Sequence, residues 1–172
     1  AIPFVLPIVE IQTWSPEKMK RDLEKDYQAL KEDGWWARFL SNHDKPRQVS
    51  LYGNDGLYWK ESAKMLACYI HTLPGTPFVY QGEELGMTNV QYDSIEEYDD
   101  ISTKDQYQMA REAGLTNEEA LEVCGRMSRD NARSPVQWDD TKHAGFTAGT
   151  PWLPVNNNYK EINVAEQTAR ED

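Results

Sequence analysis

The sequence predicts a helix-rich α/β fold in which short strands end in polar segments. Two apolar runs, at residues 37–41 and 77–80, are each followed by polar residues, and a helix-like stretch separates them. This order is typical of a barrel or an open parallel sheet, where residues beyond the carboxyl ends of the strands face the ligand. With only two convincing core strands, the sheet looks incomplete, and we do not expect two exposed parallel strands to be stable alone.

The first two helices are predicted from capping residues and apolar spacing. Residues 1–14 are expected to be extended. Ser15-Pro16-Glu17 combines an N-cap, a first-turn proline and an acidic residue, so a helix should begin there and end at Gly34. A second helix is predicted over about 58–73. Its middle, residues 65–70, is apolar almost all round, which indicates deep burial.

Two further helices are predicted from capping boxes. Thr103 is followed three residues later by Gln106, and Thr116 is followed by Glu119. In this motif each side chain of the pair accepts a hydrogen bond from a free backbone N–H at the start of the helix. Gly114 is placed to end the first of these helices.

Residues 88–160 are predicted to form a long excursion between two regular elements. Its second part, residues 128–158, is rich in Pro, Gly, Asn and Trp and is expected to be a long ordered loop of the kind that builds a site. Asn163 with Glu166 predicts one more helix start. Since the sequence stops soon afterwards, at Asp172, we expect a truncated chain.

Composition excludes several classes of protein. The 172 residues suffice for one domain, but only 39% are hydrophobic and the mean hydropathy is −0.78, so we expect a weak core. A formal net charge of −11 argues against nucleic acid or an anionic membrane as a partner. No apolar stretch approaches the roughly 20 residues of a membrane span. Cys68 and Cys124 lack metal-site spacing, and we expect buried free thiols in a cytoplasmic protein.

Asp44 is the leading candidate for chemistry. A carboxylate at the end of a strand can bind sugar hydroxyls or stabilise positive charge that develops on a reacting carbon. His43 could donate a hydrogen bond to the same ligand. The local sequence is equally consistent with an ion pair between Asp44 and Arg47 that only orders the loop.

Other acidic residues are weaker candidates. Glu83 and Glu84 are adjacent, and adjacent side chains on an extended chain point to opposite sides, so they should not act as a pair. One could face a cleft while the other braces a loop. Glu10 lies among aliphatic residues and is expected to be structural. The three histidines are scattered, and we expect neither a metal nor a cofactor.

The segment at residues 129–138 carries two arginines, an aspartate and a tryptophan. This combination suits sugar recognition, because guanidinium groups donate to hydroxyls and an indole ring stacks on a sugar. A network between Arg129, Asp130 and Arg133 that only pins the loop is an equally good interpretation.

Three motifs together resemble the alpha-amylase family of glycoside hydrolases. They are Asn42-His43-Asp44-Lys45-Pro46-Arg47, Gly75-Thr76-Pro77-Phe78-Val79-Tyr80-Gln81-Gly82-Glu83-Glu84-Leu85-Gly86-Met87 and Arg129-Asp130-Asn131-Ala132-Arg133-Ser134-Pro135-Val136-Gln137-Trp138-Asp139. The resemblance is strongest to the oligo-1,6-glucosidase, dextran glucosidase and trehalose-6-phosphate hydrolase group. It runs from about Leu6 to the end of the chain, with Lys45 as a minor departure.

The resemblance implies a partial (β/α)8 TIM barrel. Residues 1–172 would be a single segment from the C-terminal part of a catalytic barrel, with strands 7 and 8, their helices, and residues 88–160 as the excursion after strand 8. It implies that Asp44 is the third catalytic carboxylate, which stabilises an oxocarbenium-like transition state. His43, Asn42 and Arg133 would bind substrate, with Arg133 on the non-reducing-end glucose of an exo-acting enzyme.

The family's nucleophilic Asp and acid/base Glu, on strands 4 and 5, have no counterpart in this sequence. Retaining hydrolysis needs both carboxylates, roughly 5–5.5 Å apart. The resemblance therefore implies a retaining α-glucosidase for α-1,6-linked or related oligosaccharides as the full-length protein, and an inactive isolated chain that pairs with the remainder of the barrel or self-associates. Trehalose-6-phosphate hydrolase and sucrose isomerase activities stay open. So does a non-catalytic carbohydrate-binding or interaction module built from barrel pieces.

Overall fold

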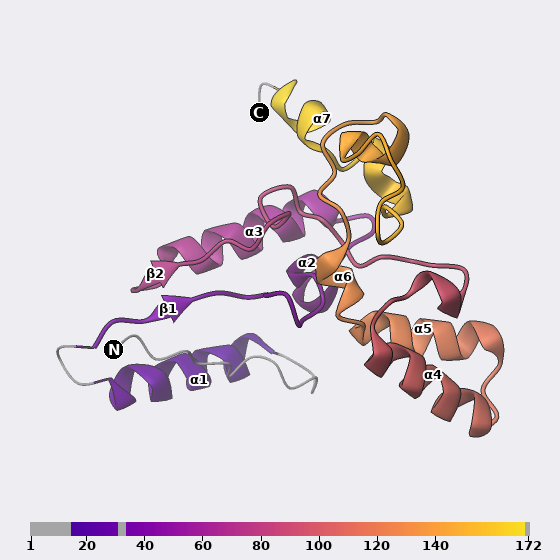
Figure 1. Cartoon of the computed structure of the whole chain (residues 1–172). Helices are drawn as coiled ribbons and strands as arrows, with labels where there is room; N and C mark the ends of the chain where they lie inside the picture. Colours follow the sequence, from indigo (N-terminus) through magenta and orange to yellow (C-terminus); the bar gives the residue numbers. More distant parts are fainter. Residues whose placement is uncertain (1–14, 31–33, 171–172) are drawn as a thin grey trace.

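A computed structural model describes residues 15–30 and 34–170 of the chain (Figure 1). Over these residues the fold is helix-rich with one small parallel sheet, as predicted, and none of the helices is both long and apolar enough to cross a membrane. The predicted extended segment and Glu10 lie outside the described residues. The elements are α1 Pro16–Ala29, β1 Ala37–Arg38, α2 Gln48–Tyr52, α3 Trp59–Thr72, β2 Thr76–Pro77, η1 Ile95–Glu97, α4 Ile101–Glu112, α5 Asn117–Met127, α6 Asp130–Arg133, η2 Lys142–Gly145, η3 Asn157–Lys160 and α7 Val164–Thr168.

The sheet pairs β1 with β2 in parallel. The N–H of Thr76 donates to the carbonyl of Trp36 at 2.8 Å, and the N–H of Phe78 donates to that of Arg38 at 2.7 Å. Both predicted strands are present but shorter than expected. Each strand pairs with one neighbour among the described residues, and Pro77 has no N–H to donate to a second one.

The first helix begins where the sequence predicts and ends early. The side chain of Ser15 accepts a hydrogen bond from the N–H of Lys18, which confirms the N-cap. The helix ends at Ala29 with Leu30 as its extended C-cap, so the predicted end at Gly34 is wrong. The helix ends because Leu30 already has an extended backbone, with φ of −78° and ψ of 118°. Helix α1 lies beside β1 in Figure 1, and residues of both line one small cavity.

Only one face of α3 is buried. Its residues Leu66 and Ile70 pack with Leu40, from the segment after β1, in the largest apolar cluster of this region. Met65 is 48% exposed and Cys68 is also exposed, so the predicted burial around the whole middle of the helix is wrong. No described element covers the outer face of α3. Both cysteines are free, and Cys124 is buried as expected.

The N-cap of helix α4 lies three residues before the predicted one, Thr103. Asp100 is its N-cap, and the Asp100 side chain accepts from the N–H of Ser102 at 3.3 Å. Thr103 instead lies inside the helix and is 2% exposed, with its hydroxyl 2.9 Å from both Asp100 Oδ2 and Ser128 Oγ. Asp100 prevails as the cap because a charged acceptor at a helix N-terminus gains from the helix dipole, and because Arg129 also holds the Asp100 carboxylate in place.

The predicted capping box of α5 is confirmed. Thr116 Oγ1 accepts from the N–H of Glu119 at 3.2 Å, and the Glu119 side chain accepts from the N–H of Thr116 at 2.8 Å. Gly114, at a φ of +96°, follows the end of α4 as predicted. Helices α4 and α5 lie side by side as a hairpin (Figure 1).

The segment after α5 is mostly irregular, with α6, η2 and η3 as short turns of helix. It returns to its own start: the N–H of Val164 donates to the carbonyl of Gln137 at 3.1 Å, and that of Ala165 donates to Trp138 at 2.9 Å. Asn163 caps α7 by accepting from the N–H of Glu166 at 2.7 Å, which confirms the predicted helix start.

Candidate functional site

A tight turn after β1 turns His43 and Asp44 outward. The side-chain oxygen of Asn42 accepts from the N–H of Asp44 at 2.9 Å, and the carbonyl of Asn42 accepts from the N–H of Lys45 at 3.3 Å. An asparagine side chain commonly bonds the backbone two residues on and so shapes such turns. The side chains of His43 and Asp44 are 70% and 46% exposed, so both are open to a ligand.

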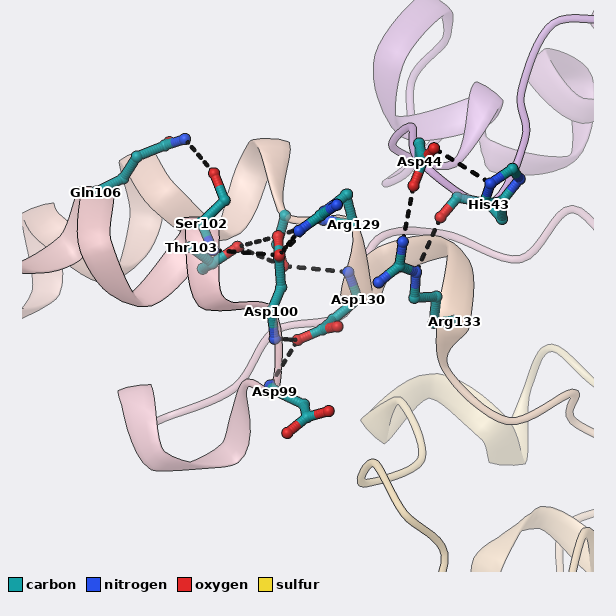
Figure 2. Close-up of polar contacts among 11 residues, drawn as sticks. His43, Asp44, Asp99, Asp100, Ser102, Thr103, Gln106, Arg129, Asp130 and Arg133 are labelled. Carbon is teal, nitrogen blue, oxygen red and sulfur yellow. Dashed lines mark hydrogen bonds and ion pairs between the residues drawn. The ribbon is translucent and has the colours of Figure 1, made fainter.

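Arg133 meets this turn from 89 residues further along the chain (Figure 2). Its Nη2 donates to Asp44 Oδ1 at 2.7 Å, and its Nε donates to the backbone carbonyl of His43 at 3.0 Å. The His43 ring nitrogen Nε2 lies 3.2 Å from the other carboxylate oxygen of Asp44. The structure therefore brings Asp44, His43 and Arg133 together at one exposed site. The Asn42 side chain shapes the turn that carries His43 and Asp44.

Arg47 does not pair with Asp44. Its side chain is fully buried and points the other way, where Nε donates to the carbonyl of Asn131 at 2.9 Å and Nη1 to that of Gln81 at 2.5 Å. Burial lowers the pKa of Arg47 to about 10. The predicted alternative of a local ion pair with Asp44 is wrong. A buried guanidinium satisfies its donors on several acceptors, and the carbonyls that supply them come from distant segments.

The two adjacent glutamates have separate structural contacts. Glu83 is buried and accepts from the hydroxyl of Ser41 and from the N–H of Tyr80, the latter at 2.8 Å. Burial raises the pKa of Glu83, against the effect of these two hydrogen bonds. Glu84 is exposed and accepts from the N–H of Gly82 at 2.8 Å. The backbone turns here instead of extending, and Glu83 braces the loop after β2.

The two arginines at residues 129–133 have different partners (Figure 2): Arg129 holds the loop in place, and Arg133 points to the candidate site. Arg129 forms an ion pair with Asp100, and Asp130 Oδ2 accepts from the N–H groups of Asp99 at 2.7 Å and Asp100 at 2.9 Å. These contacts pin the loop, as one interpretation expected, but they do so through Asp99 and Asp100 and not through pairing of Arg129, Asp130 and Arg133 with one another. Arg133, at the other end of α6, is directed at Asp44 instead.

The middle of α6 is fixed by polar contacts to three other segments. The fully buried Asn131 side chain accepts from the N–H of Val90 at 3.0 Å and donates to the carbonyl of Gly125 at 2.8 Å. The Tyr80 hydroxyl donates to the carbonyl of Ala132 at 3.0 Å. Sequence reasoning assigned no role to these side chains. The available signal was the position of Asn131, a polar residue inside a short helix next to two arginines. The sequence could not show which groups it binds, because Val90 is 41 residues away.

No three His, Cys, Asp or Glu side chains gather in a way that could hold a metal ion within residues 15–30 and 34–170. The site therefore offers a carboxylate, an imidazole and a guanidinium at an open surface. Such a set can bind several hydroxyls of one sugar ring and stabilise a neighbouring positive charge.

Comparison with known proteins gives a consistent result. The model of the alpha amylase catalytic domain matches residues 7–172. The chain is 53% identical to an oligo-1,6-glucosidase of Parageobacillus thermoglucosidasius, over 90% of this chain and 28% of that protein. It is similar to the crystal structure of Bacillus licheniformis trehalose-6-phosphate hydrolase, with 55% identity and a TM-score of 0.77 over 80% of this chain and 25% of that one.

A second similar structure is a variant of isomaltulose synthase from Erwinia rhapontici NX5, solved in complex with its natural substrate sucrose. Its identity to this chain is 46% and its TM-score 0.82, over 92% of this chain and 29% of that one. The chain thus spans between a quarter and a third of the length of these relatives.

Proposed function

This chain belongs to the alpha-amylase family, and on that premise we propose that it is part of a retaining, exo-acting α-glucosidase that hydrolyses α-1,6-linked or related oligosaccharides. The observation that carries the proposal is the pairing of Asp44 with Arg133 at 2.7 Å. Two side chains from motifs far apart in the sequence meet at an exposed site beyond the end of β1, where a barrel enzyme places its chemistry.

In this proposal the chain is a C-terminal segment of a catalytic barrel. We assign β1 and β2 to strands 7 and 8 of the barrel, and residues 88–160 to the connection between strand 8 and helix 8. The nucleophilic Asp and the acid/base Glu would come from strands outside this sequence. The parallel order of β1 and β2, with α3 as the crossover between them, supports the assignment.

Asp44 would act by stabilising the positive charge of the oxocarbenium-like transition state. A carboxylate about 4 Å from such a charge contributes about 4 kcal/mol at an effective dielectric constant of about 20. This energy corresponds to roughly three orders of magnitude in rate. Arg133 and His43, which lie against the same carboxylate, would bind hydroxyls of the non-reducing-end glucose. Asn42 would contribute to the same ring while it holds the turn.

We place the protein in a reducing, cytoplasmic compartment, because Cys68 is an exposed unpaired thiol and Cys124 a buried one. The oligosaccharide would be its small-molecule partner, and the remainder of the barrel its macromolecular one. Neither a cofactor nor a metal takes part in the proposed reaction.

The test compares Asp44→Asn with wild type in the full-length protein, with glucose release from isomaltose as the assay. We expect kcat to fall by about 1,000-fold or more, while stability changes by about 1 kcal/mol at most, because the ion pair is half exposed. Asp55→Asn is the matched control, since Asp55 is an exposed aspartate in the loop that follows α2.

An Asp44→Asn variant that keeps a tenth or more of the wild-type turnover would contradict the assigned role. A wild-type protein that binds isomaltose in calorimetry but releases no glucose would favour the non-catalytic binding module instead.

A further inference from the structure

Arg133 lies on a helix that is too short to be stable without contacts from other segments. Helix α6 has four residues, Asp130–Arg133, and so completes little more than one turn. A helix of this length is unstable by itself, because nucleation fixes several residues for one or two hydrogen bonds. Contacts from outside α6 must therefore set where the Arg133 guanidinium lies.

Asp100 supplies several of these contacts at the start of α6. Its carboxylate accepts from Nε of Arg129 at 3.0 Å, from Nη2 of the same side chain, and from the Arg129 N–H at 3.3 Å. In return, Asp130 Oδ2 accepts from the N–H of Asp100 at 2.9 Å. The bonds run in both directions, so the start of α4 and the start of α6 hold one another.

The Asp100 carboxylate is charged although its side chain is only 2% exposed. Burial works to raise the pKa of Asp100, but the hydrogen bonds from Arg129 and Thr103 outweigh it and lower the pKa to about 2. A buried carboxylate of this kind has few alternative positions, because any movement would break a charge-assisted hydrogen bond.

Arg129 connects this buried anchor to the open site. Figure 2 shows its side chain between Asp100 and the pair formed by Asp44 and Arg133. Its positive charge interacts mainly with Asp100 and to a lesser extent with Asp44. Its side chain is 41% exposed, so it can be replaced without opening a cavity in the core.

We propose that Asp100 is a positioning residue of the site: it fixes Arg129 and the start of α6, and so sets how Arg133 meets Asp44. The inference rests on the proposed function, since it assigns Asp100 a part in the binding of the glucose held by Arg133. Asp100 forms no hydrogen bond or ion pair with His43, Asp44 or Arg133, all of which the structure describes, and would act only through Arg129 and α6.

The test uses the full-length protein and p-nitrophenyl α-D-glucopyranoside, with the variants Asp100→Asn, Arg129→Gln and the double variant. We expect each single variant to raise KM by about tenfold and to leave kcat within about twofold, because uniform binding is lost. The double variant should be no worse than either single one, because both changes break the same connection. Asp99→Asn is the matched control: it is the same substitution at the adjacent, exposed side chain.

A merely structural role would give a different result. Loss of folded enzyme lowers the apparent kcat and the melting temperature and leaves KM unchanged. Arg129→Gln, which should fold, would then have the KM of wild type, and that result would overturn the inference. KM increases that multiply in the double variant would overturn it as well.

Two parallel measurements separate this inference from the proposed function. If wild type hydrolyses the glycoside and Asp44→Asn does not, the proposed function holds and the KM values test Asp100 alone. If wild type is inactive, the proposed function fails, and the calorimetric Kd for 1-deoxynojirimycin, a glucose-like ligand, tests the positioning role without turnover. A Kd that Asp100→Asn and Arg129→Gln both weaken about tenfold supports the role, and an unchanged Kd refutes it.

Discussion

Replacement of Arg47 by Met should destabilise the full-length protein by about 1.5 kcal/mol, within a range of roughly 0–3 kcal/mol. The fully buried guanidinium makes two good hydrogen bonds, to Asn131 at 2.9 Å and Gln81 at 2.5 Å. Hydrogen bonds to a charged group contribute about 1.5–3 kcal/mol each, so their combined loss costs roughly 3–6 kcal/mol. The pKa of Arg47 is lowered to about 10, mainly by burial, so its surroundings disfavour the charged side chain by roughly 3 kcal/mol in net, a cost that Met would not carry.

Replacement of Arg47 by Lys should destabilise the protein more than Met does. Lysine keeps a buried charge but has no planar fork of donors, and an ammonium is more strongly hydrated than a guanidinium. The carbonyls of Asn131 and Gln81 cannot both be reached from one nitrogen as they are from Nε and Nη1. The desolvation cost therefore remains while part of the hydrogen bonding is lost.

Urea unfolding followed by tryptophan fluorescence measures both changes as shifts of the midpoint at constant slope. Arg126→Met is the matched control, because the Arg126 side chain is 72% exposed and should change stability by less than about 0.5 kcal/mol. The reasoning is refuted if Arg47→Lys proves more stable than Arg47→Met, or if Arg47→Met loses more than about 5 kcal/mol.

Three further predictions concern pH, activity and association. The pKa of Glu83 in the folded protein is raised above its ordinary value of 4.5. Its contribution to stability is therefore present below pH 4.5 and is lost as the pH rises through the pKa of the folded state. Glu83→Gln should flatten that part of a plot of melting temperature against pH, and parallel plots for the variant and wild type would contradict this. The isolated polypeptide of residues 1–172 should release no glucose from isomaltose above the buffer rate, and a measurable gain would refute the assignment of the nucleophile and the acid/base to other strands. The same polypeptide should self-associate in light scattering, because Phe78 and Val79 beyond the open edge of β2 are 52% and 48% exposed; a sharp monomeric profile would count against this.

The features that could be predicted from the sequence are those whose partners are close along the chain. The capping box of Thr116 and Glu119 joins residues three apart, and the structure has both of its hydrogen bonds. Thr103 has the same local pattern with Gln106, yet Asp100 displaces it as the cap, because Asp100 is also held by Arg129 from a distant segment. The local pattern alone cannot distinguish these two cases.

The site shows the same limit. Arg47 is three residues from Asp44, and a local ion pair was a reasonable interpretation, but the actual partner of Asp44 is Arg133, 89 residues away. The sequence indicated that Arg133 binds the non-reducing-end glucose only through the resemblance of whole motifs to a known family. Burial separates the two arginines: Arg47 lies in the interior, and the side chain of Arg133 is 28% exposed.

The segment between residues 138 and 164 is closed at its base, where Gln137 and Trp138 accept backbone hydrogen bonds from Val164 and Ala165. Arg133 precedes this closure, and its own hydrogen bonds go to His43 and Asp44. Asn156 and Asn158 tie the later part of the segment to Thr88, but residues 145–152 are mostly exposed. Changes in the length of residues 145–152 should therefore leave the arginine in place, and each doubling of a flexible loop costs only about 0.6 kcal/mol in closure entropy. This segment is accordingly the natural place for relatives to diverge, and for an engineer to graft a reporter peptide, without rebuilding the anchor.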